Sequence, residues 1–297
     1  MHSERKHMSD PQRPAQTPGK RSVAPHEAYN LFTRESVLLL DACGSPGPSL
    51  PGSAWCDTSG GAPLLQAAAA AREKVLNEYT PDHCRECLLL CDPDEPQRMD
   101  AVVRWLLGEE GGCRTVFCAS RRALLESHAF LFNVDSVHAL PCYPSEIIAG
   151  QLFLGSAATA NEAALDALQI THVLSVVERE LLPPFGRAHL WLPIVDADDV
   201  ELRPILGPAL RFVSAALGGG GRVLVHCERG ASRSVSVVCA HLMCARALAL
   251  ADALAHVKAQ RPCAQPNVGF LRQLEGLDVG ALLVETDERT AACRIES

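Results

Sequence analysis

The segment Val223–Ser234 constrains the fold of this chain more than any other part of it. Its first residues, Val223–Val225, form a short apolar run typical of a buried strand, and a turn containing Gly230 separates them from an expected helix. Cys227 lies where the strand ends, and five residues separate it from Arg233. This spacing predicts that a thiol, a series of backbone N–H groups and a guanidinium surround one small concavity.

Such a concavity suits a phosphate dianion, because helix N-termini and successive loop amides attract anions. The same field lowers the pKa of a thiol, so we expect Cys227 to be largely thiolate at neutral pH. A thiolate is a nucleophile, and a guanidinium can hold two phosphate oxygens. An ordinary buried cysteine is the alternative, but five residue types coincide at the spacing that the chemistry needs. They are His226, Cys227, Gly230, Arg233 and Ser234.

This string resembles the Cys-x5-Arg signature of the protein tyrosine phosphatase superfamily, and its ending Ala231–Ser234 is similar to that of the dual-specificity branch. The resemblance implies that Cys227 attacks phosphorus and that Arg233 holds the transferring phosphoryl group. It also implies that the Ser234 hydroxyl helps the sulfur to leave in a second step. The phosphate-binding residues between them are Glu228, Arg229, Gly230, Ala231 and Ser232.

A phosphatase of this kind needs a general acid for the leaving oxygen. The resemblance places it at the end of Leu192–Asp196, and Asp196 precedes Cys227 by 31 residues, which fits the family's spacing. Asp198 and Asp199 are the alternatives. An acidic solvated loop without any catalytic carboxylate is the third interpretation.

Residues 143–280 resemble a dual-specificity phosphatase domain along their whole length. The supporting matches are Phe153–Ser156, Ile170–Val173, Ala240–Met243 and the residues from Arg261 to Leu274. His241 stands where the family usually has Tyr, and we expect it to affect packing. We expect Asn267 to cap the last helix rather than to act in catalysis.

Residues 27–138 alternate apolar strand-like runs with amphipathic helices, which predicts a second α/β domain. This region resembles a rhodanese-like domain in Leu38–Asp41, in Leu50–Ala54 and between Cys87 and Cys118. The cysteine nearest to a rhodanese nucleophile is Cys91, and three carboxylates follow it within four residues. Because carboxylates raise the pKa of a nearby thiol and repel an anionic substrate, we expect no sulfur transfer. We expect this domain to bind a partner or to support the fold.

The elements expected in both regions follow from hydrophobic periodicity. The strands are 36–41, 87–91, 114–118, a pair over 147–154, 170–177, 189–195 and the run from 223. The helices are 64–76, 96–107, 121–132, 160–168, 205–217, one that opens at Ser232–Ser234 and runs through 238–247, and 250–260.

The cysteine content and the net charge restrict the compartment and the partners that we expect. Thirteen cysteines, an odd number, without a secretory signal favour reduced thiols in the cytoplasm or the nucleus. The pair Cys84 and Cys87 lacks a second pair at zinc-site spacing, so we expect no metal and no cofactor. A net charge of −8 disfavours nucleic acid and anionic membrane as partners, and no apolar stretch predicts a membrane span. Residues 1–26 are expected to be a disordered tail, and residues 281–297 a C-terminal tail.

The prediction is therefore an α/β protein with a rhodanese-like domain followed by a dual-specificity phosphatase-like domain. This order resembles that of MAP kinase phosphatases and of pseudophosphatases of the serine/threonine/tyrosine-interacting type. We expect a cysteine-dependent phosphatase that acts on phosphotyrosine and phosphoserine or phosphothreonine in proteins. The alternatives are a phosphoprotein-binding scaffold and a phosphoinositide or RNA phosphatase. The docking Arg cluster that MAP kinase phosphatases carry is missing from Asp57–Pro63, which disfavours a MAP kinase as the substrate.

Overall fold

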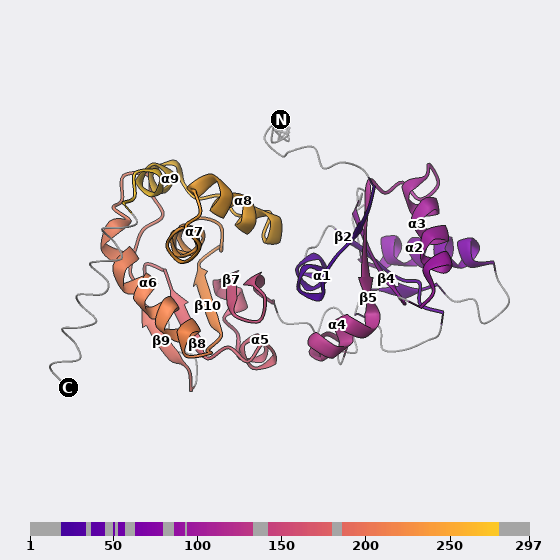
Figure 1. The fold of residues 1–297 in the computed structure, drawn as a ribbon, viewed down its shortest axis with the longest axis horizontal. Helices are drawn as coiled ribbons and strands as arrows, with labels where there is room; N and C mark the ends of the chain where they lie inside the picture. Colours follow the sequence, from indigo (N-terminus) through magenta and orange to yellow (C-terminus); the bar gives the residue numbers. More distant parts are fainter. Residues whose placement is uncertain are drawn as a thin grey trace, which may run out of the picture. The chain divides into compact units, whose positions relative to one another are not determined.

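The computed structural model describes residues 19–33, 37–44, 50, 53–56, 63–79, 86–92, 94–132, 142–179 and 186–278. Contacts divide the chain into two compact units. Unit 1 comprises Met1–Val23, Ser36–Ser49 and Ser53–Arg121; unit 2 comprises Ala24–Glu35, Leu50–Gly52 and Arg122–Ser297. Each unit contains a five-stranded sheet with helices, so the predicted α/β class is confirmed (Figure 1). Within the described ranges no helix is long and apolar enough to cross a membrane.

Unit 1 is built on a parallel sheet with the strand order β1-β5-β4-β2-β3. Its inner strands are almost continuously apolar and buried, as expected for a parallel sheet that is covered on both faces. The strands are β1 (Gly19–Ser22), β2 (Val37–Asp41), β3 (Ala54–Trp55), β4 (Glu86–Cys91) and β5 (Thr115–Ser120). The helices are α2 (Leu64–Tyr79) and α3 (Pro96–Leu107), close to the expected ranges.

Strand β1 lies within the segment that was expected to be a disordered tail. It pairs in parallel with β5, and the amide of Gly19 donates to the carbonyl of Arg114 at 3.0 Å. The ammonium of Lys20 also bonds Asp100 at 2.7 Å. The sequence of β1 has no apolar alternation, so its pairing depends on main-chain bonds that hydrophobic patterns do not reveal. The expectation therefore does not hold for residues 19–26, whereas residues 1–18 and 281–297 lie outside the described residues.

Unit 2 has the strand order β6-β7-β10-β8-β9, in which only β6 runs antiparallel to its neighbour. The strands are β6 (Ser145–Ile148), β7 (Leu152–Ser156), β8 (His172–Ser175), β9 (Ala188–Trp191) and β10 (Val223–Cys227). The α-helices are α1 (Pro25–Phe32), α4 (Arg121–Ser127, beginning at the boundary of the units), α5 (Glu162–Ala167), α6 (Arg203–Gly218), α7 (Arg233–Arg246), α8 (Leu250–Gln260) and α9 (Val268–Glu275). Short 3-10 helices are η1 (Ala129–Phe132) and η3 (Ala157–Thr159).

Helix α7 is the buried centre of unit 2. It follows β10 directly and is flanked by α6, α8 and α9 (Figure 1). It begins at Arg233, within the residues Ser232–Ser234 that were expected to open this helix. Strands β8 and β9 are shorter than expected, so the chain leaves the sheet after Ser175 and after Trp191. The residues that follow β9 are thereby free to approach the end of β10.

Helix α1 belongs to unit 2 although it precedes most of unit 1 in the sequence. The side chain of Asn30 accepts from the amide of Glu146 at 2.7 Å and donates to its carbonyl at 2.8 Å. Because β6 is an edge strand, this amide side chain completes its open edge. The hydroxyl of Tyr29 donates to the carbonyl of Pro144 at 2.6 Å. From the sequence, residues 27–138 were expected to form one domain, whereas α1 is part of unit 2. The contacts of Asn30 and Tyr29 with β6 and the residue before it are single side-chain hydrogen bonds, and these leave no periodic pattern in the sequence.

Candidate active site around Cys227

The loop from Cys227 to Arg233 joins the central strand of unit 2 to its buried helix. Gly230 has a φ of +66°, a backbone conformation that favours glycine. A Cβ at this position would also collide with the carbonyl of Gly155 and with the guanidinium of Arg261. Gly230 is therefore needed for both conformation and space, and the loop is a tight turn as predicted.

Cys227 is 1% exposed and lies at the end of β10. Its Sγ accepts hydrogen bonds from Ser234 Oγ at 3.1 Å and from the Gly230 amide at 3.2 Å. Burial alone raises the pKa of this thiol. The hydrogen bonds from Ser234 and Gly230, with the charge of Arg233, outweigh burial and hold the pKa below its ordinary value. The structure thus favours the thiolate at the place where the sequence predicted a nucleophile.

Arg233 is 6% exposed, and its guanidinium is only partly engaged. Nη1 donates to the carbonyl of Ile194 at 3.2 Å and lies 3.6 Å from Glu178 Oε1. Nε lies 3.7 Å from Asp196 Oδ2 and has no hydrogen-bond partner among the described residues. A buried N–H without a partner is unfavourable, so this donor suits an anion bound in the loop.

The N-terminus of α7 is left without a side-chain cap. Ser232 is at the N-cap position, but its hydroxyl makes no capping bond. It donates to Asp196 Oδ1 at 2.6 Å instead. Since the first amides of a helix have no partner within the helix, the uncapped end of α7 contributes N–H groups and a positive dipole end to the anion site.

Asp196 is the only one of the three acidic candidates that contacts this loop among the described residues. Its Oδ1 accepts from Ser232 Oγ and from Asn267 Nδ2, the latter at 2.9 Å. Asp198 accepts instead from the amide of Gly269 at 3.4 Å, and Asp199 is exposed. The geometry therefore favours Asp196 as the acid.

Asn267 has two contacts. Its Oδ1 accepts from the amide of Phe270 at 2.7 Å, which confirms the predicted helix cap of α9. Its Nδ2 binds Asp196, which sequence reasoning missed. One side chain thus fixes both the helix and the acid. The family resemblance over Arg261–Leu274 includes Asn267, but it did not indicate that Asn267 binds Asp196.

Arg261 donates hydrogen bonds to carbonyl groups of the loop. It is a further residue of the site that the sequence did not indicate. Its Nε donates to the carbonyl of Gly230 at 2.7 Å, and its Nη2 donates to that of Arg229 at 3.3 Å. The amide of Gln265 donates to the carbonyl of Ala231 at 2.7 Å. These carbonyls are held by groups outside the loop, while the Gly230 amide points at the sulfur. The side chains of Glu228 and Arg229 are exposed.

Two buried histidines lie beside the loop and within α7. His226 Nε2 is 2.7 Å from Ser175 Oγ, and burial lowers the pKa of His226 to about 4. Burial, with the charge of Arg246, lowers the pKa of His241 to about 4. Both rings are neutral at physiological pH. His241 lies at 4% exposure inside α7, in a packing position.

Cys91, the candidate in unit 1, has a different environment. Its Sγ donates to the carbonyl of Ala119 at 3.3 Å. Burial, followed by the neighbouring Cys118, raises the pKa of Cys91 to about 12, and Asp92 contributes less. The sequence argument gave the right direction, but burial and not the acidic loop is the main cause. A protonated, hydrogen-bonded thiol is a poor nucleophile.

Comparison with known proteins agrees with this geometry. Residues 152–278 match the catalytic domain of dual specificity phosphatases. Dual specificity protein phosphatase 1 of Arabidopsis thaliana is 43% identical over 138 residues, which cover 46% of this chain and 69% of that protein. Human dual specificity phosphatase 28 is 40% identical over 130 residues, 43% of this chain and 74% of that one. A probable rhodanese domain-containing dual specificity protein phosphatase of Dictyostelium discoideum is 36% identical over 135 residues, 45% of this chain and 28% of that one.

The residues that match include the whole loop from Cys227 to Arg233. These similarities show that the chain belongs to the dual specificity phosphatase family.

Proposed function

We propose that this chain hydrolyses phosphotyrosine and phosphoserine or phosphothreonine in proteins through a phosphocysteine intermediate on Cys227. One observation carries the proposal: the thiol of Cys227 is buried, and the hydrogen bonds from Ser234 and Gly230 with the charge of Arg233 nevertheless hold its pKa below the ordinary value. Keeping a thiolate in a buried place is useful for a nucleophile and unfavourable for a structural cysteine.

In the first step, the thiolate of Cys227 attacks phosphorus. The S–P bond forms while the bond from phosphorus to the substrate oxygen breaks. Arg233 and the loop amides stabilise the negative charge on the equatorial oxygens. Asp196, protonated for this step, gives its proton to the leaving oxygen.

In the second step, water attacks the phosphocysteine, and Asp196, now a carboxylate, accepts the proton of that water. The S–P bond breaks and the electron pair returns to sulfur. The hydroxyl of Ser234, 3.1 Å from Sγ, donates to the departing thiolate and stabilises it. Inorganic phosphate then leaves the loop.

The partner is a phosphoprotein, and a MAP kinase is one candidate through the family resemblance. The segment where that family carries its docking Arg cluster, residues 57–62, lies outside the described residues. We infer that unit 1 is a rhodanese-like domain that supports the fold or binds a partner, in line with the rhodanese domain in the name of the Dictyostelium relative. The free cysteines of the described residues suit a reducing compartment, the cytoplasm or the nucleus.

A phosphoprotein-binding scaffold with no turnover is the rival, and one experiment separates the two functions. Phosphate release from phosphotyrosine and phosphothreonine peptides is measured with the metal chelator EDTA present, for wild type, Cys227→Ser and Cys263→Ser. Cys263 is an exposed free cysteine and serves as the matched control. We expect Cys227→Ser to bind peptide and release no phosphate, because a hydroxyl is a poor nucleophile at its free pKa.

The Cys263→Ser protein should keep wild-type turnover. If the wild type binds the peptide as tightly as Cys227→Ser does and also releases no phosphate, the protein is a phosphoprotein-binding scaffold instead.

A further inference from the structure

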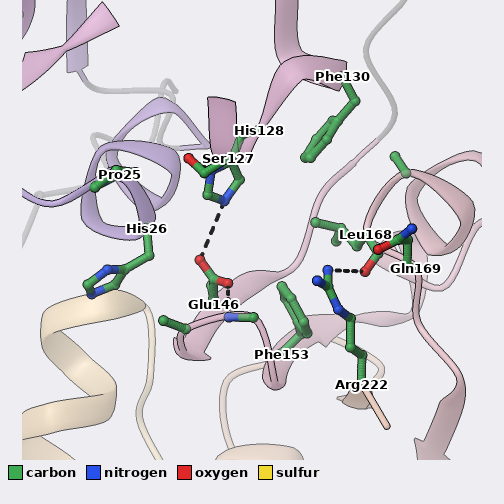
Figure 2. A pocket seen from close by; sticks show the side chains of 13 residues that line it. Pro25, His26, Ser127, His128, Phe130, Glu146, Phe153, Leu168, Gln169 and Arg222 are labelled. Carbon is green, nitrogen blue, oxygen red and sulfur yellow. Dashed lines mark hydrogen bonds and ion pairs between the residues drawn. The ribbon is translucent and has the colours of Figure 1, made fainter. Parts of the chain in front are cut away.

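Unit 2 contains a pocket of about 360 Å³ that is separate from the phosphate loop. Its walls come from the start of α1, the end of α4 with η1, strands β6 and β7 with their turn, and the end of α5 (Figure 2). Arg222 lines it just before β10 begins, whereas Cys227 is the last residue of β10. Since a strand rises by about 3.3 Å per residue, the two sites lie at opposite ends of this strand, roughly 16 Å apart.

A buried carboxylate points into this pocket. Glu146 is 3% exposed. Its Oε1 accepts from the Gly150 amide, and its Oε2 has no hydrogen-bond partner among the described residues (Figure 2). Leaving a buried acceptor unpaired costs free energy, and a carboxylate oxygen costs more than a neutral one. The free oxygen therefore indicates a place for a donor.

The neighbouring histidine presents a second acceptor to the same space. Ser127 Oγ donates to the carbonyl of Ala123 at 2.8 Å, which uses its only proton. The same Oγ lies 2.9 Å from His128 Nδ1 and, with its proton given to Ala123, accepts from that nitrogen, which places a ring proton on Nδ1. Nε2 lies 3.6 Å from Glu146 Oε2, and in a neutral ring protonated at Nδ1 it carries a lone pair. Figure 2 draws this contact as a dashed line; at 3.6 Å it is longer than a hydrogen bond, so a donor placed between the two side chains can bond both of them.

The geometry favours an ammonium group over a guanidinium. Oε1 is committed to Gly150, so a planar guanidinium finds only one carboxylate oxygen and loses its bidentate pairing. An ammonium has three donors that rotate to suit, and it can reach both Glu146 Oε2 and His128 Nε2. Phe130 and Phe153 line the pocket and offer apolar surface to an alkyl chain. The other ionisable lining groups are His26 and Arg222, and Arg222 Nη1 donates to the carbonyl of Leu168 at 3.0 Å.

We propose that this pocket binds the side-chain ammonium of a lysine presented by a partner protein, held between Glu146 and His128. It is a docking site that goes beyond the phosphatase activity, because it lies at the other end of β10 from the nucleophile. A partner held there leaves the phosphate loop free for a phosphorylated residue.

The test is an NMR titration of the full chain with Nα-acetyl-lysine methylamide and with its norleucine counterpart, which lacks only the ammonium. We expect saturable shifts at Gly150 and Ala149 with the lysine amide alone. Glu146→Gln should weaken its binding on the order of tenfold to a hundredfold, the usual value of a hydrogen bond to a charged group. Glu162→Gln, at an exposed position in α5, is the control and should bind as wild type. Turnover of a small aryl phosphate should be the same in all three proteins.

Three outcomes would overturn the proposal. The norleucine amide could bind the wild type as tightly as the lysine amide does, Glu146→Gln could bind the lysine amide as tightly as the wild type does, or the wild type could show no binding of the lysine amide. A second measurement does not depend on any variant. The ¹⁵N shifts of His128 in the free wild type at pH 7.5 should show a neutral ring protonated at Nδ1. If His128 were an imidazolium, it would itself form the ion pair with Glu146, and the carboxylate would need no ammonium from a partner.

Discussion

The hydroxyl of Ser232 donates to Oδ1 of Asp196 at 2.6 Å, so a direct hydrogen bond joins the loop of Cys227–Arg233 to the segment that carries Asp196. Asn267 donates to the same oxygen, which leaves Oδ2 facing Nε of Arg233 at 3.7 Å. The oxygen that faces the phosphate site is therefore the one available to carry the transferred proton. In the proposed mechanism, Asp196 is thus positioned by two residues that do not themselves react.

We expect Asp196→Asn to lower kcat on phosphopeptides on the order of 10²-fold or more, the usual contribution of general acid catalysis. The loss should be smaller for aryl phosphates with acidic phenols, because such leaving groups depart without a proton. Steady-state rates on both substrate types, across pH, measure this. The basic limb of the pH–rate profile should flatten in the variant.

Asp198→Asn and Asp199→Asn are the controls for this prediction. Asp198 bonds the start of α9 and Asp199 is exposed, so neither change should affect the proton transfer. If one of them abolished turnover while Asp196→Asn remained active, the assignment of the acid would be wrong.

Arg233→Lys should lower kcat/KM on the order of 10³-fold, as expected for the loss of a strong electrostatic stabiliser. A lysine cannot match two phosphoryl oxygens, and it cannot keep the bond that Nη1 makes to Ile194 while it contacts phosphate. Rates on a phosphotyrosine peptide measure the loss. A decrease of less than about tenfold would mean that the loop amides alone stabilise the phosphoryl group.

The catalytic loop was predictable from the sequence because its chemistry is local. The thiol, the glycine and the guanidinium of Cys227, Gly230 and Arg233 lie within seven consecutive residues, and the strand and helix around them have clear apolar patterns. The ranges of α3 and α8 were predicted to the residue for the same reason, since strong periodicity and flanking prolines or glycines define them.

The supporting contacts were not predictable, because they join residues far apart in the chain. Asn267 reaches Asp196 across 71 positions, and Asn30 reaches Glu146 across 116. Each depends on the direction of one polar side chain, which no periodicity records. Strand β1 was missed for a related reason, since polar edge strands pair through the main chain alone.

Unit 1 should show no thiosulfate:cyanide sulfur transfer. Its candidate thiol, Cys91, has a pKa raised to about 12, so the thiol form dominates at neutral pH. Thiocyanate formation by wild type and by Cys91→Ala should be equal and at background. Transfer by the wild type that disappears in Cys91→Ala would give unit 1 a catalytic role.

Ser234→Ala should affect both the ionisation of Cys227 and the second chemical step. In the wild type, burial raises the pKa of the thiol, and hydrogen bonds led by that of the Ser234 hydroxyl lower it below the ordinary value. Removing the hydroxyl removes a lowering contribution, so the pKa of Cys227 must rise. The acidic limb of kcat/KM reports the deprotonation of this thiol in the free enzyme, and it should therefore move to higher pH.

The same variant should slow the breakdown of phosphocysteine on the order of tenfold or more, because the departing thiolate loses a hydrogen bond to a charged group. Rapid-quench kinetics should then show a burst of phenol followed by slow phosphate release, at a pH high enough for Cys227 to be ionised. Ser236→Ala is the matched control, since the hydroxyl of Ser236 is buried in α7 but bonds the carbonyl of Ser232 at 3.0 Å and not the sulfur. An unmoved acidic limb without a burst in Ser234→Ala would show that Ser234 supports the loop without acting on the sulfur.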